Sequence, residues 1–586
     1  MFFNRKQYYT LSQQQFDEMK QFYEKLGFRK NQVQKLCKKC FSADIRVEKS
    51  LTYSNNWTFY RRSDMDDGDF FSGRSAMSSG MPMASGMPGA MRMAMRSAPM
   101  AEEVEDGLPA PVEMAEPVPT EPPQPLNTAE THNVPENESH SPLDNAQVIF
   151  SANVNTASWN YLRNRIHNHS LLDPSFVRME EIINSYEYDL PKPDEGQLFG
   201  ITAESGKCPW NEDHELLFLG FKGKKADKDC RQNLVLLVDV SGSMEDEWIL
   251  TQMSIAAIIS KLKEGDTLSI ISYSDKTTTV AKQLDCGNMD KLVNAVMEIE
   301  GTGGCTYGSE GLENAYRYLQ ETFDENANNR IFIFTDGDFN FGVTSEGGLE
   351  ELIYDKRQTG IYLSIVGYGQ NNFKDNKMET LARNGNGNYT FVANPADILD
   401  ELWTKLVSNL VTVAKDVKIS VELNPALVSE YRLLGYDDRK LTQQEFHNTE
   451  KAVDGMGSEH NVAALIELKR GKAEQKYKGR FVNVSAGDNQ DEIAFVEVHY
   501  KSPEGENLVM TKSVTLQELQ QAKNCNMPAA ALLASFGLMV KKSAYKGDMT
   551  KNRLLDMASA LMKEKGIETP ERFSHLDIIR KYAVND

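Results

Sequence analysis

Three short segments of the chain combine carboxyl and hydroxyl side chains in the way that a divalent cation requires. The first is the Asp-Val-Ser-Gly-Ser sequence of residues 239–243, in which two serines follow a carboxylate at the second and fourth positions. The second is Gly-Gly-Cys-Thr at 303–306, which adds a hydroxyl, and the third is Thr-Asp at 335–336, which adds a carboxylate. Hard cations such as Mg²⁺ prefer oxygen ligands of these kinds. The sequence therefore predicts a Mg²⁺ site, with Mn²⁺ as the alternative ion, whose ligands are Asp239, Ser241, Ser243, Thr306 and Asp336.

The residues around each segment predict the elements that hold it. The apolar run 233–238 is typical of a buried strand and ends immediately before Asp239. A second apolar run, 331–334, ends immediately before Thr335, and Thr306 stands at the entrance of an amphipathic helix. Ligands of an open parallel sheet bind beyond the carboxyl ends of its strands. We therefore expect the three segments to meet at one edge of one sheet.

Strand and helix patterns alternate throughout this part of the chain. Strands are predicted at 233–238, 267–273, 331–334, 361–366 and 389–392, and helices through 248–262, 292–299, 312–323, 349–357 and from Pro395 onward. Repeated βα units with apolar strands favour a mostly parallel sheet that helices cover on both faces. The predicted fold class is α/β with a doubly wound sheet.

A change of the hydrophobic period to two after residue 414 predicts a β-rich unit. Apolar side chains alternate with polar ones from Val417 to Leu423, and further strands are predicted at 462–468, 493–500 and 508–515. An apolar strand at 216–222 lies ahead of the α/β segment, and the pattern shows no other strand between 150 and 230. Because a lone strand is unstable in water, we expect it to pair with a strand between 415 and 515. The α/β domain would then be inserted into a β-sandwich-like domain.

These patterns divide the chain into six parts. We expect a small helical module at 1–65, a linker at 66–145, the first part of the β-rich domain at 146–231, the α/β domain at 232–412, the second part of the β-rich domain at 413–515 and a helical segment at 516–586. The linker is rich first in Met, Gly and Ser and then in Pro and Glu. Such a composition cannot bury enough apolar surface to offset chain entropy, so we expect the linker to be disordered.

Composition excludes several classes of function. Among 586 residues, 64 Lys and Arg stand against 85 Asp and Glu, which gives a formal net charge of −21. A chain this acidic repels phosphate backbones, so we expect no nucleic-acid partner. No apolar run is long enough to span a bilayer, and no signal-peptide pattern follows the first residues. With seven cysteines, too few for a disulfide framework, these features favour a cytoplasmic location, with the cell surface by a non-standard route as the alternative.

The cation-ligand segments resemble the metal-ion-dependent adhesion site of von Willebrand factor type A (VWA) domains, and residues 232 to about 410 have the matching βα order. The resemblance implies that Ser241, Ser243 and Thr306 bind the metal directly, and that Asp239 and Asp336 bind it directly or through water. It also implies that an Asp or Glu side chain of a protein partner supplies a final ligand.

Sequences outside that domain resemble the bacterial YfbK-like subfamily. They are Glu-Glu-Ile-Ile-Asn at 180–184, Cys-Pro-Trp-Asn at 208–211 with His214, Ala-Lys-Asp-Val-Lys at 414–418 and Glu-Tyr-Arg-Leu-Leu-Gly-Tyr at 430–436. The resemblance covers roughly residues 146–586. That subfamily often carries a lipoprotein or secretory signal, which this sequence does not show.

These features predict a non-enzymatic, metal-dependent protein-interaction module. The rival hypotheses are a metal-dependent hydrolase and, by resemblance, an assembly subunit for a partner ATPase. No His or Lys occurs in 239–247, 301–309 or 335–342, so these loops lack the usual general base and we assign no catalytic residue.

Other motifs give weaker signals. Cys37 and Cys40 could form half of a zinc site, but no second pair of ligands stands at zinc-finger spacing, and two ordinary thiols are the favoured interpretation. Cys305 is expected to be a small packed residue. The glycine-rich run 301–308 lacks the Gly-Lys-Ser/Thr ending of a phosphate-binding loop. Asp338 stands close to Asp336 but is left out of the ligand set.

Overall fold

A computed structural model gives the structure of most of the chain outside the expected linker. It describes residues 9–10, 13–39, 60–61, 135–152, 155–226, 230–301, 303–304, 306–338, 345–357, 359–369, 375–406, 411–449, 453–473, 491–503, 505–522, 526–564 and 569–584. The predicted disorder of the linker concerns residues that lie outside this part of the chain, except for 135–145.

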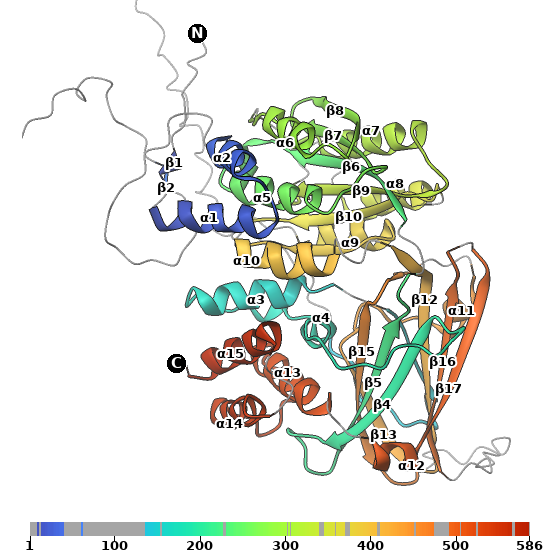
Figure 1. Cartoon of the computed structure of the whole chain (residues 1–586). Helices are drawn as coiled ribbons and strands as arrows, with labels where there is room; N and C mark the ends of the chain where they lie inside the picture. Colours follow the sequence, from blue (N-terminus) through green and yellow to red (C-terminus); the bar gives the residue numbers. More distant parts are fainter. Residues whose placement is uncertain are drawn as a thin grey trace, which may run out of the picture. The chain divides into compact units, whose positions relative to one another are not determined.

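A six-stranded sheet forms the centre of the α/β domain (Figure 1), in the order β11-β10-β9-β6-β7-β8. Its strands are β6 (Arg231–Asp239), β7 (Thr267–Tyr273), β8 (Thr277–Asp285), β9 (Ala327–Thr335), β10 (Tyr362–Gly367) and β11 (Tyr389–Phe391). Neighbouring strands are parallel except β7 and β8. This confirms the predicted doubly wound, mostly parallel sheet. The antiparallel edge strand β8 was not predicted.

Helices cover both faces of this sheet because successive side chains of a buried strand point to opposite sides. Leu234, Leu236 and Val238 belong to one apolar core, whereas Val235 and Leu237 belong to another. The first core is closed by α5 (Trp248–Ile259), α6 (Met289–Glu298) and the π-helix η3 (Ile398–Leu406), which follows the short α10 (Pro395–Asp397). The second core is closed by α7 (Gly308–Glu321), α8 (Glu346–Arg357) and α9 (Asp375–Asn384).

Two further sheets enclose a separate apolar core and form a β-sandwich. One has the order β13-β15-β5-β4 and consists of β4 (Phe199–Lys207), β5 (Glu215–Gly223), β13 (Val428–Leu434) and β15 (Asn461–Arg470). The other has the order β14-β12-β16-β17 and consists of β12 (Thr412–Leu423), β14 (Met456–Gly457), β16 (Glu492–Lys501) and β17 (Asn507–Thr515), with β3 (Gln147–Ser151) also paired to β12.

The predicted pairing across the inserted domain is present. β5 lies ahead of the α/β domain in the chain and pairs antiparallel with β15, which follows it; Leu217 stands opposite Ile466. The expectation that no other strand lies between 150 and 230 was wrong, because β4 pairs along the whole length of β5. Gly200 and Gly206 interrupt the side-chain pattern of β4 and hide it from sequence reading.

Helices near both ends of the described chain complete the structure. Between β3 and β4 lie α3 (Ala157–His167), the 3₁₀ turn η1 (Pro174–Phe176) and α4 (Met179–Asn184). The short α11 (Gln443–His447) and α12 (Leu516–Gln521) follow later, and α13 (Met527–Val540), α14 (Lys551–Leu561) and α15 (Pro570–Val584) are the last described elements. α13 is apolar all round and is buried accordingly. A Cβ on Gly537 of α13 would lie 2.5 Å from Met179 Sδ, so α13 approaches α4 closely there.

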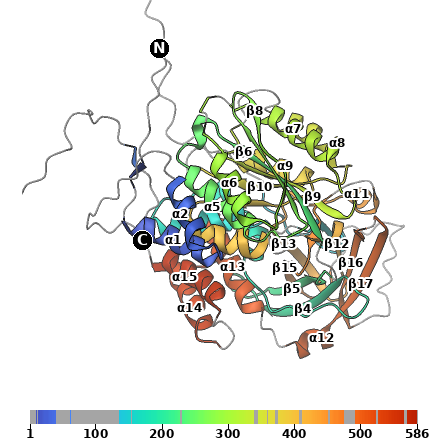
Figure 2. The same cartoon turned by 45° about the horizontal axis from the view of Figure 1, so that its top comes forward.

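The predicted helical module near the start of the chain is a helical hairpin of α1 (Gln13–Lys25) and α2 (Lys30–Lys39). A two-residue ladder of β1 (Tyr9–Thr10) and β2 (Tyr60–Arg61) is also present. The hairpin shares the apolar core of α5 and α6 (Figure 2). Arg29 Nη2 lies 2.8 Å from Asp290 Oδ2 on α6. The hairpin is therefore packed onto the α/β domain.

Residues 135–145 were expected in the disordered linker, and their contacts correct that boundary. Asn137 is buried and its Nδ2 donates to the carbonyl oxygens of Leu433 at 3.0 Å and Gly435 at 2.7 Å. His140 forms a bridge with Tyr431 of β13. Composition shows neither interaction, since both depend on β13, almost 300 residues further along the chain.

Candidate metal centre

Asp239 is the last residue of β6, and its carboxyl organises the loop that follows. The residue is fully buried. Its Oδ1 accepts a hydrogen bond from the backbone N–H of Ser241 at 3.0 Å, which folds the chain into a tight turn. The two serine hydroxyls of the loop, Ser241 Oγ and Ser243 Oγ, are 3.2 Å apart. Ser241 is buried and Ser243 is exposed, so this loop offers a pair of oxygens of which one faces solvent.

The loop before α7 is attached to the loop of Asp239 by backbone hydrogen bonds. Gly303 N–H donates to Val240 O at 3.1 Å, and Gly242 N–H donates to Gly304 O at 3.3 Å. Both Gly303 and Gly304 have positive φ, which glycine adopts without strain. Thr306 follows and is buried. The structure thus brings the second predicted segment against the first.

The third loop follows β9, the direct neighbour of β6 in the sheet. Asp336 is fully buried, and its Oδ1 accepts from the backbone N–H of Asp338 at 3.0 Å. A hydrogen bond from the Ser243 hydroxyl is among the interactions that lower the pKa of Asp336, so the first and third loops also meet. The structure therefore joins the segments of all five predicted ligands at one edge of the sheet.

The electrostatics of the two carboxyls favour a cation. Burial is the main cause that raises the pKa of Asp239 to about 7; the nearby Asp336 carboxyl raises it further, while hydrogen bonds from Ser241 and Thr335 lower it. Burial likewise raises the pKa of Asp336. Two carboxyls in this setting lose their charge unless a positive charge compensates them. Oxygen ligands and surplus negative charge are what Mg²⁺ and Mn²⁺ require, so these residues fit a divalent ion.

Three of the five predicted ligands are hydroxyls. Among the described residues, no group of three or more His, Cys, Asp or Glu side chains is arranged to hold a metal ion. The candidate centre has two carboxyls, and its other oxygens come from Ser241, Ser243 and Thr306.

Sequence reasoning missed three residues beside the centre. Thr335 Oγ1 donates to Asp239 Oδ2 at 3.0 Å. The side chain of Tyr273 is buried, and its pKa is raised first by burial and then by Asp239. Burial and the carboxyls of Asp246 and Asp336 raise the pKa of Glu247 to about 7. Only Thr335 had a signal in the sequence, its position directly before Asp336.

The weaker motifs add no site within the described residues. Cys37 lies on α2, and its side chain is buried in the core that α2 shares with α5 and α6. Burial raises the pKa of its thiol to about 11, so it is a packed thiol. Cys40 and Cys305 lie outside the described part of the chain. Asp338 is half-buried and holds the Asp336 loop through its backbone.

The sheet order and the three loops define a VWA domain, and comparison with known families agrees. The family described as von Willebrand factor type A domain matches residues 233–403. The family described as the C-terminal part of the uncharacterized protein YfbK matches 408–582, and a family described as von Willebrand factor matches 125–218.

Similar proteins extend this result beyond the VWA domain. The uncharacterized protein YfbK of Escherichia coli (strain K12) is 30% identical over 430 residues, which are 70% of this chain and 74% of that protein. The chain belongs to the YfbK family of VWA-domain proteins.

More distant similarities are confined to part of the chain or to the fold. The inter-alpha-trypsin inhibitor heavy chain H3 of Mesocricetus auratus is 29% identical over 165 residues, 27% of this chain and 18% of that protein. The crystal structure of the ArnB paralog VWA2 from Sulfolobus acidocaldarius has 14% identity and a TM-score of 0.34, covering 66% of this chain and 98% of that chain. None of the helices in the described ranges is long and apolar enough to cross a bilayer.

Proposed function

We propose that the chain is a non-enzymatic protein-interaction module whose VWA domain holds a Mg²⁺ ion, with Mn²⁺ as the alternative. The ligands of the ion are Asp239, Ser241, Ser243, Thr306 and Asp336, and an Asp or Glu side chain of a partner protein completes the coordination. The observation that carries the proposal is the buried pair Asp239 and Asp336, brought to one sheet edge beside serine hydroxyls.

The residues of the centre have separate tasks in this account. Asp239 and Asp336 supply the negative charge that retains the ion, and their backbone hydrogen bonds fix both carboxyls before it binds. Ser243 is the exposed member of the donor set, so a partner carboxylate approaches from its side. When bound, the ion supplies a positive charge that attracts that carboxylate.

Membership of the VWA family supports an interaction role. The similarity to inter-alpha-trypsin inhibitor heavy chain H3 extends over 165 residues, which is about the length of the VWA match at 233–403. The three loops contain no His or Lys to take a proton from a substrate. Loops on a rigid sheet are well suited to hold a binding surface in a fixed geometry.

Affinity capture with metal control tests the proposed function. The full chain is immobilised and exposed to a lysate of the source organism in Mg²⁺, bound proteins are eluted with EDTA, and each is then purified and titrated against the chain. We expect a partner whose affinity for the chain is at least tenfold lower in EDTA than in Mg²⁺, and at least tenfold lower for Asp336→Ala than for the wild type. Neutralising one acidic residue of that partner should also abolish its binding.

A surface variant of the same domain provides the control. Glu313 is an exposed carboxylate on α7, and Glu313→Ala should bind the partner like the wild type. Equal affinity of the wild type and Asp336→Ala for every captured partner would contradict the proposed function.

A further inference from the structure

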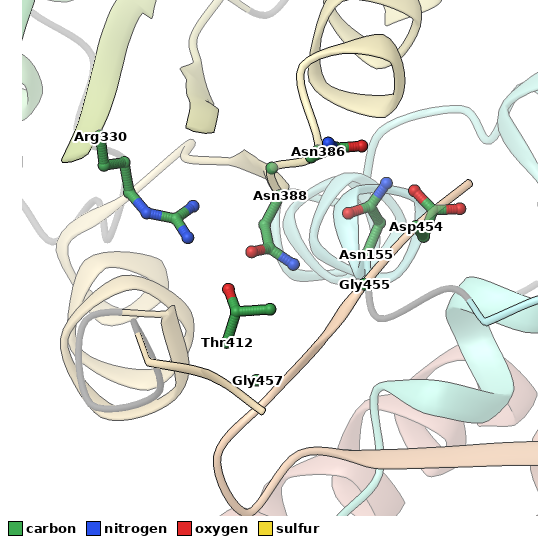
Figure 3. Close-up of a pocket in the computed structure, with 9 residues that line it drawn as sticks. Asn155, Arg330, Asn386, Asn388, Thr412, Asp454, Gly455 and Gly457 are labelled. Atoms are coloured by element: carbon green, nitrogen blue, oxygen red, sulfur yellow. The ribbon is translucent and has the colours of Figure 1, made fainter. Parts of the chain in front are cut away.

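A polar pocket lies at the edge of the VWA sheet opposite to the candidate metal centre. Its walls come from the start of β9, from the turn before β11 and from the β12 and β14 strands of the sandwich (Figure 3). The pocket is small and partly open to solvent. Arg330, Asn386, Asn388 and Thr412 face this space, and we call it the Arg330 pocket.

Arg330 is a buried cation without an acidic partner among the described residues. Only 3% of it is exposed. Its Nη1 donates to Ser364 Oγ at 2.6 Å, its guanidinium carbon lies 5.0 Å from the centre of the Tyr362 ring, and its Nε has no hydrogen-bond partner in the described structure. Burial lowers the pKa of Arg330 to about 10, which still leaves it charged near neutral pH. Buried charges are normally paired, so this one calls for an anion.

Asn386 also lines this pocket, with its side-chain oxygen on the side of Asn155 and away from Arg330 (Figure 3). Its side-chain Oδ1 is buried and has no hydrogen-bond partner in the described structure. The residue has φ +53°, in the left-handed region that asparagine adopts more readily than most residues with a side chain. The adjacent Gly387 holds the turn against β10, because a Cβ there would lie 1.7 Å from Leu363 O. The turn therefore fixes the amide at the pocket.

The carboxylate that also borders the pocket is already neutralised. Asp454 Oδ2 lies 2.7 Å from Arg439 Nη1 and accepts a hydrogen bond from Ser151 Oγ at 3.2 Å. Asp454 stands at the opposite end of the pocket from Arg330 (Figure 3). The two ends therefore differ: the carboxylate at one end is paired with Arg439, whereas the guanidinium at the other has no acidic partner among the described residues.

We propose that the Arg330 pocket binds a small oxyanion of the phosphate type, either inorganic phosphate or the phosphate group of a small metabolite. The planar guanidinium offers parallel N–H donors to two oxygens of such an anion. A monoprotonated phosphate also carries an O–H, which can donate to an oxygen of Asn388 or Thr412, the side chains drawn beside Arg330 (Figure 3). One ligand would thus compensate the buried guanidinium that the described structure leaves without an acidic partner.

The position of the pocket gives binding a consequence for the fold. Arg330 and Asn386 belong to the VWA domain, whereas Thr412 and Gly457 belong to paired strands of the sandwich. An anion held by both would stabilise their contact. This inference does not rest on metal binding, so it can hold or fail separately from the proposed function.

Calorimetric titration of the full chain with inorganic phosphate tests the proposal, at pH 7.5, in EDTA and at constant ionic strength. We expect one saturable site per chain, with affinity at least tenfold weaker in Arg330→Gln. Arg317→Gln removes an exposed arginine of α7 and should bind like the wild type. Sulfate, which has no O–H at this pH, should bind more weakly than phosphate.

Other outcomes decide the remaining questions. Tighter binding of glycerol 3-phosphate than of inorganic phosphate would identify the ligand as a phosphate group of a larger molecule. If Arg330→Gln does not fold, Arg330→Lys, which keeps the charge but loses the planar fork, replaces it with the same expected loss. The absence of saturable binding to the wild type, or unchanged affinity in the folded Arg330 variant, would overturn the proposal and leave a water-filled pocket.

Discussion

Thr335 Oγ1 donates a hydrogen bond to Asp239 Oδ2 at 3.0 Å, so the last residue of β9 holds the carboxyl at the end of β6. Thr335 Oγ1 also accepts a hydrogen bond from the backbone N–H of Gly337 at 3.0 Å, which shapes the loop of Asp336. One hydroxyl therefore links the loops of both candidate carboxylate ligands. The link exists because β6 and β9 are parallel neighbours whose carboxyl ends coincide.

Replacing this hydroxyl should weaken both the fold and metal binding. Thr335→Val keeps the shape of the side chain but leaves a buried carboxyl oxygen and the Gly337 N–H without their partner. We expect a loss of about 1–3 kcal/mol in the free energy of unfolding, measured by urea denaturation. Mg²⁺ affinity should fall as well. Thr335→Ser retains the hydroxyl, so its free energy of unfolding and its Mg²⁺ affinity should fall much less than those of Thr335→Val. Equal losses in the two variants would contradict the role given to the hydroxyl and would indicate that the methyl group matters as much.

The two glycines before Thr306 provide a matched pair. Both have positive φ, but a Cβ on Gly303 would meet nothing within 4 Å, whereas one on Gly304 would lie 2.3 Å from Asp275 Oδ2. Gly303→Ala should therefore cost only the backbone strain, about 1 kcal/mol, and Gly304→Ala should cost more because Asp275 must also move. Thermal melting and Mn²⁺ titration measure both effects. If Gly303→Ala proves the more harmful, the contact with Asp275 does not constrain this loop.

The buried Glu180 should make stability depend on pH. Burial is the main cause that raises its pKa to about 8, and the carboxyls of Asp438, Glu181 and Asp437 add to it. Below about pH 8 the folded state keeps a proton that the unfolded state releases above its ordinary pKa of 4.5. The contribution of this proton to the free energy of unfolding is thus complete below pH 4.5. It is lost as the pH rises towards 8, by at most about 1.4 kcal/mol per pH unit.

Glu180→Gln removes this titration while keeping an oxygen that can accept the N–H of Tyr436. Urea denaturation at pH 5, 6.5 and 8 should show the variant gaining stability relative to the wild type as the pH rises. A difference between the two proteins that stays constant over this range would show that Glu180 is ionised in the folded state.

Pairing of β5 with β15 predicts how fragments behave. A fragment of residues 413–586 lacks β4 and β5, so β15 loses a partner along its buried length. We expect this fragment to show no sharp melting transition and to acquire one when residues 135–231 are co-expressed with it. Cooperative melting of the C-terminal fragment alone would mean that the upstream strands are not needed for the sandwich.

The α/β domain could be predicted because its signals are local. The strands β6 and β9 contain the apolar runs 234–238 and 331–334; Asp239 follows the first run directly, and Asp336 follows the second after Thr335. The edge strand β8 was missed because much of it is polar and exposed, with a pattern like that of a loop. The structure also showed that β4, diluted by two glycines, pairs with β5.

Contacts between distant residues set the limit of sequence reading. Asp239 and Asp336 were placed at one edge because both lie just beyond predicted apolar strands, but the hydrogen bond from Thr335 depends on which strands are neighbours. The Arg330 pocket had no signal at all. Its residues come from several elements of two domains, and a lone arginine in a strand does not reveal that its charge is buried without a described acidic partner.

Calorimetric titration of the EDTA-treated full chain with Mn²⁺ and Mg²⁺ tests the central claim most directly. Asp239→Asn is the informative variant, because it keeps the size of the side chain and an oxygen for the Ser241 N–H while removing the charge. We predict one divalent-ion site per chain in the wild type and in Glu313→Ala, and at least a tenfold loss of affinity in Asp239→Asn with its circular dichroism spectrum unchanged. Absence of binding by the wild type, or equal affinity in the folded Asp239 variant, would contradict a metal centre at these residues.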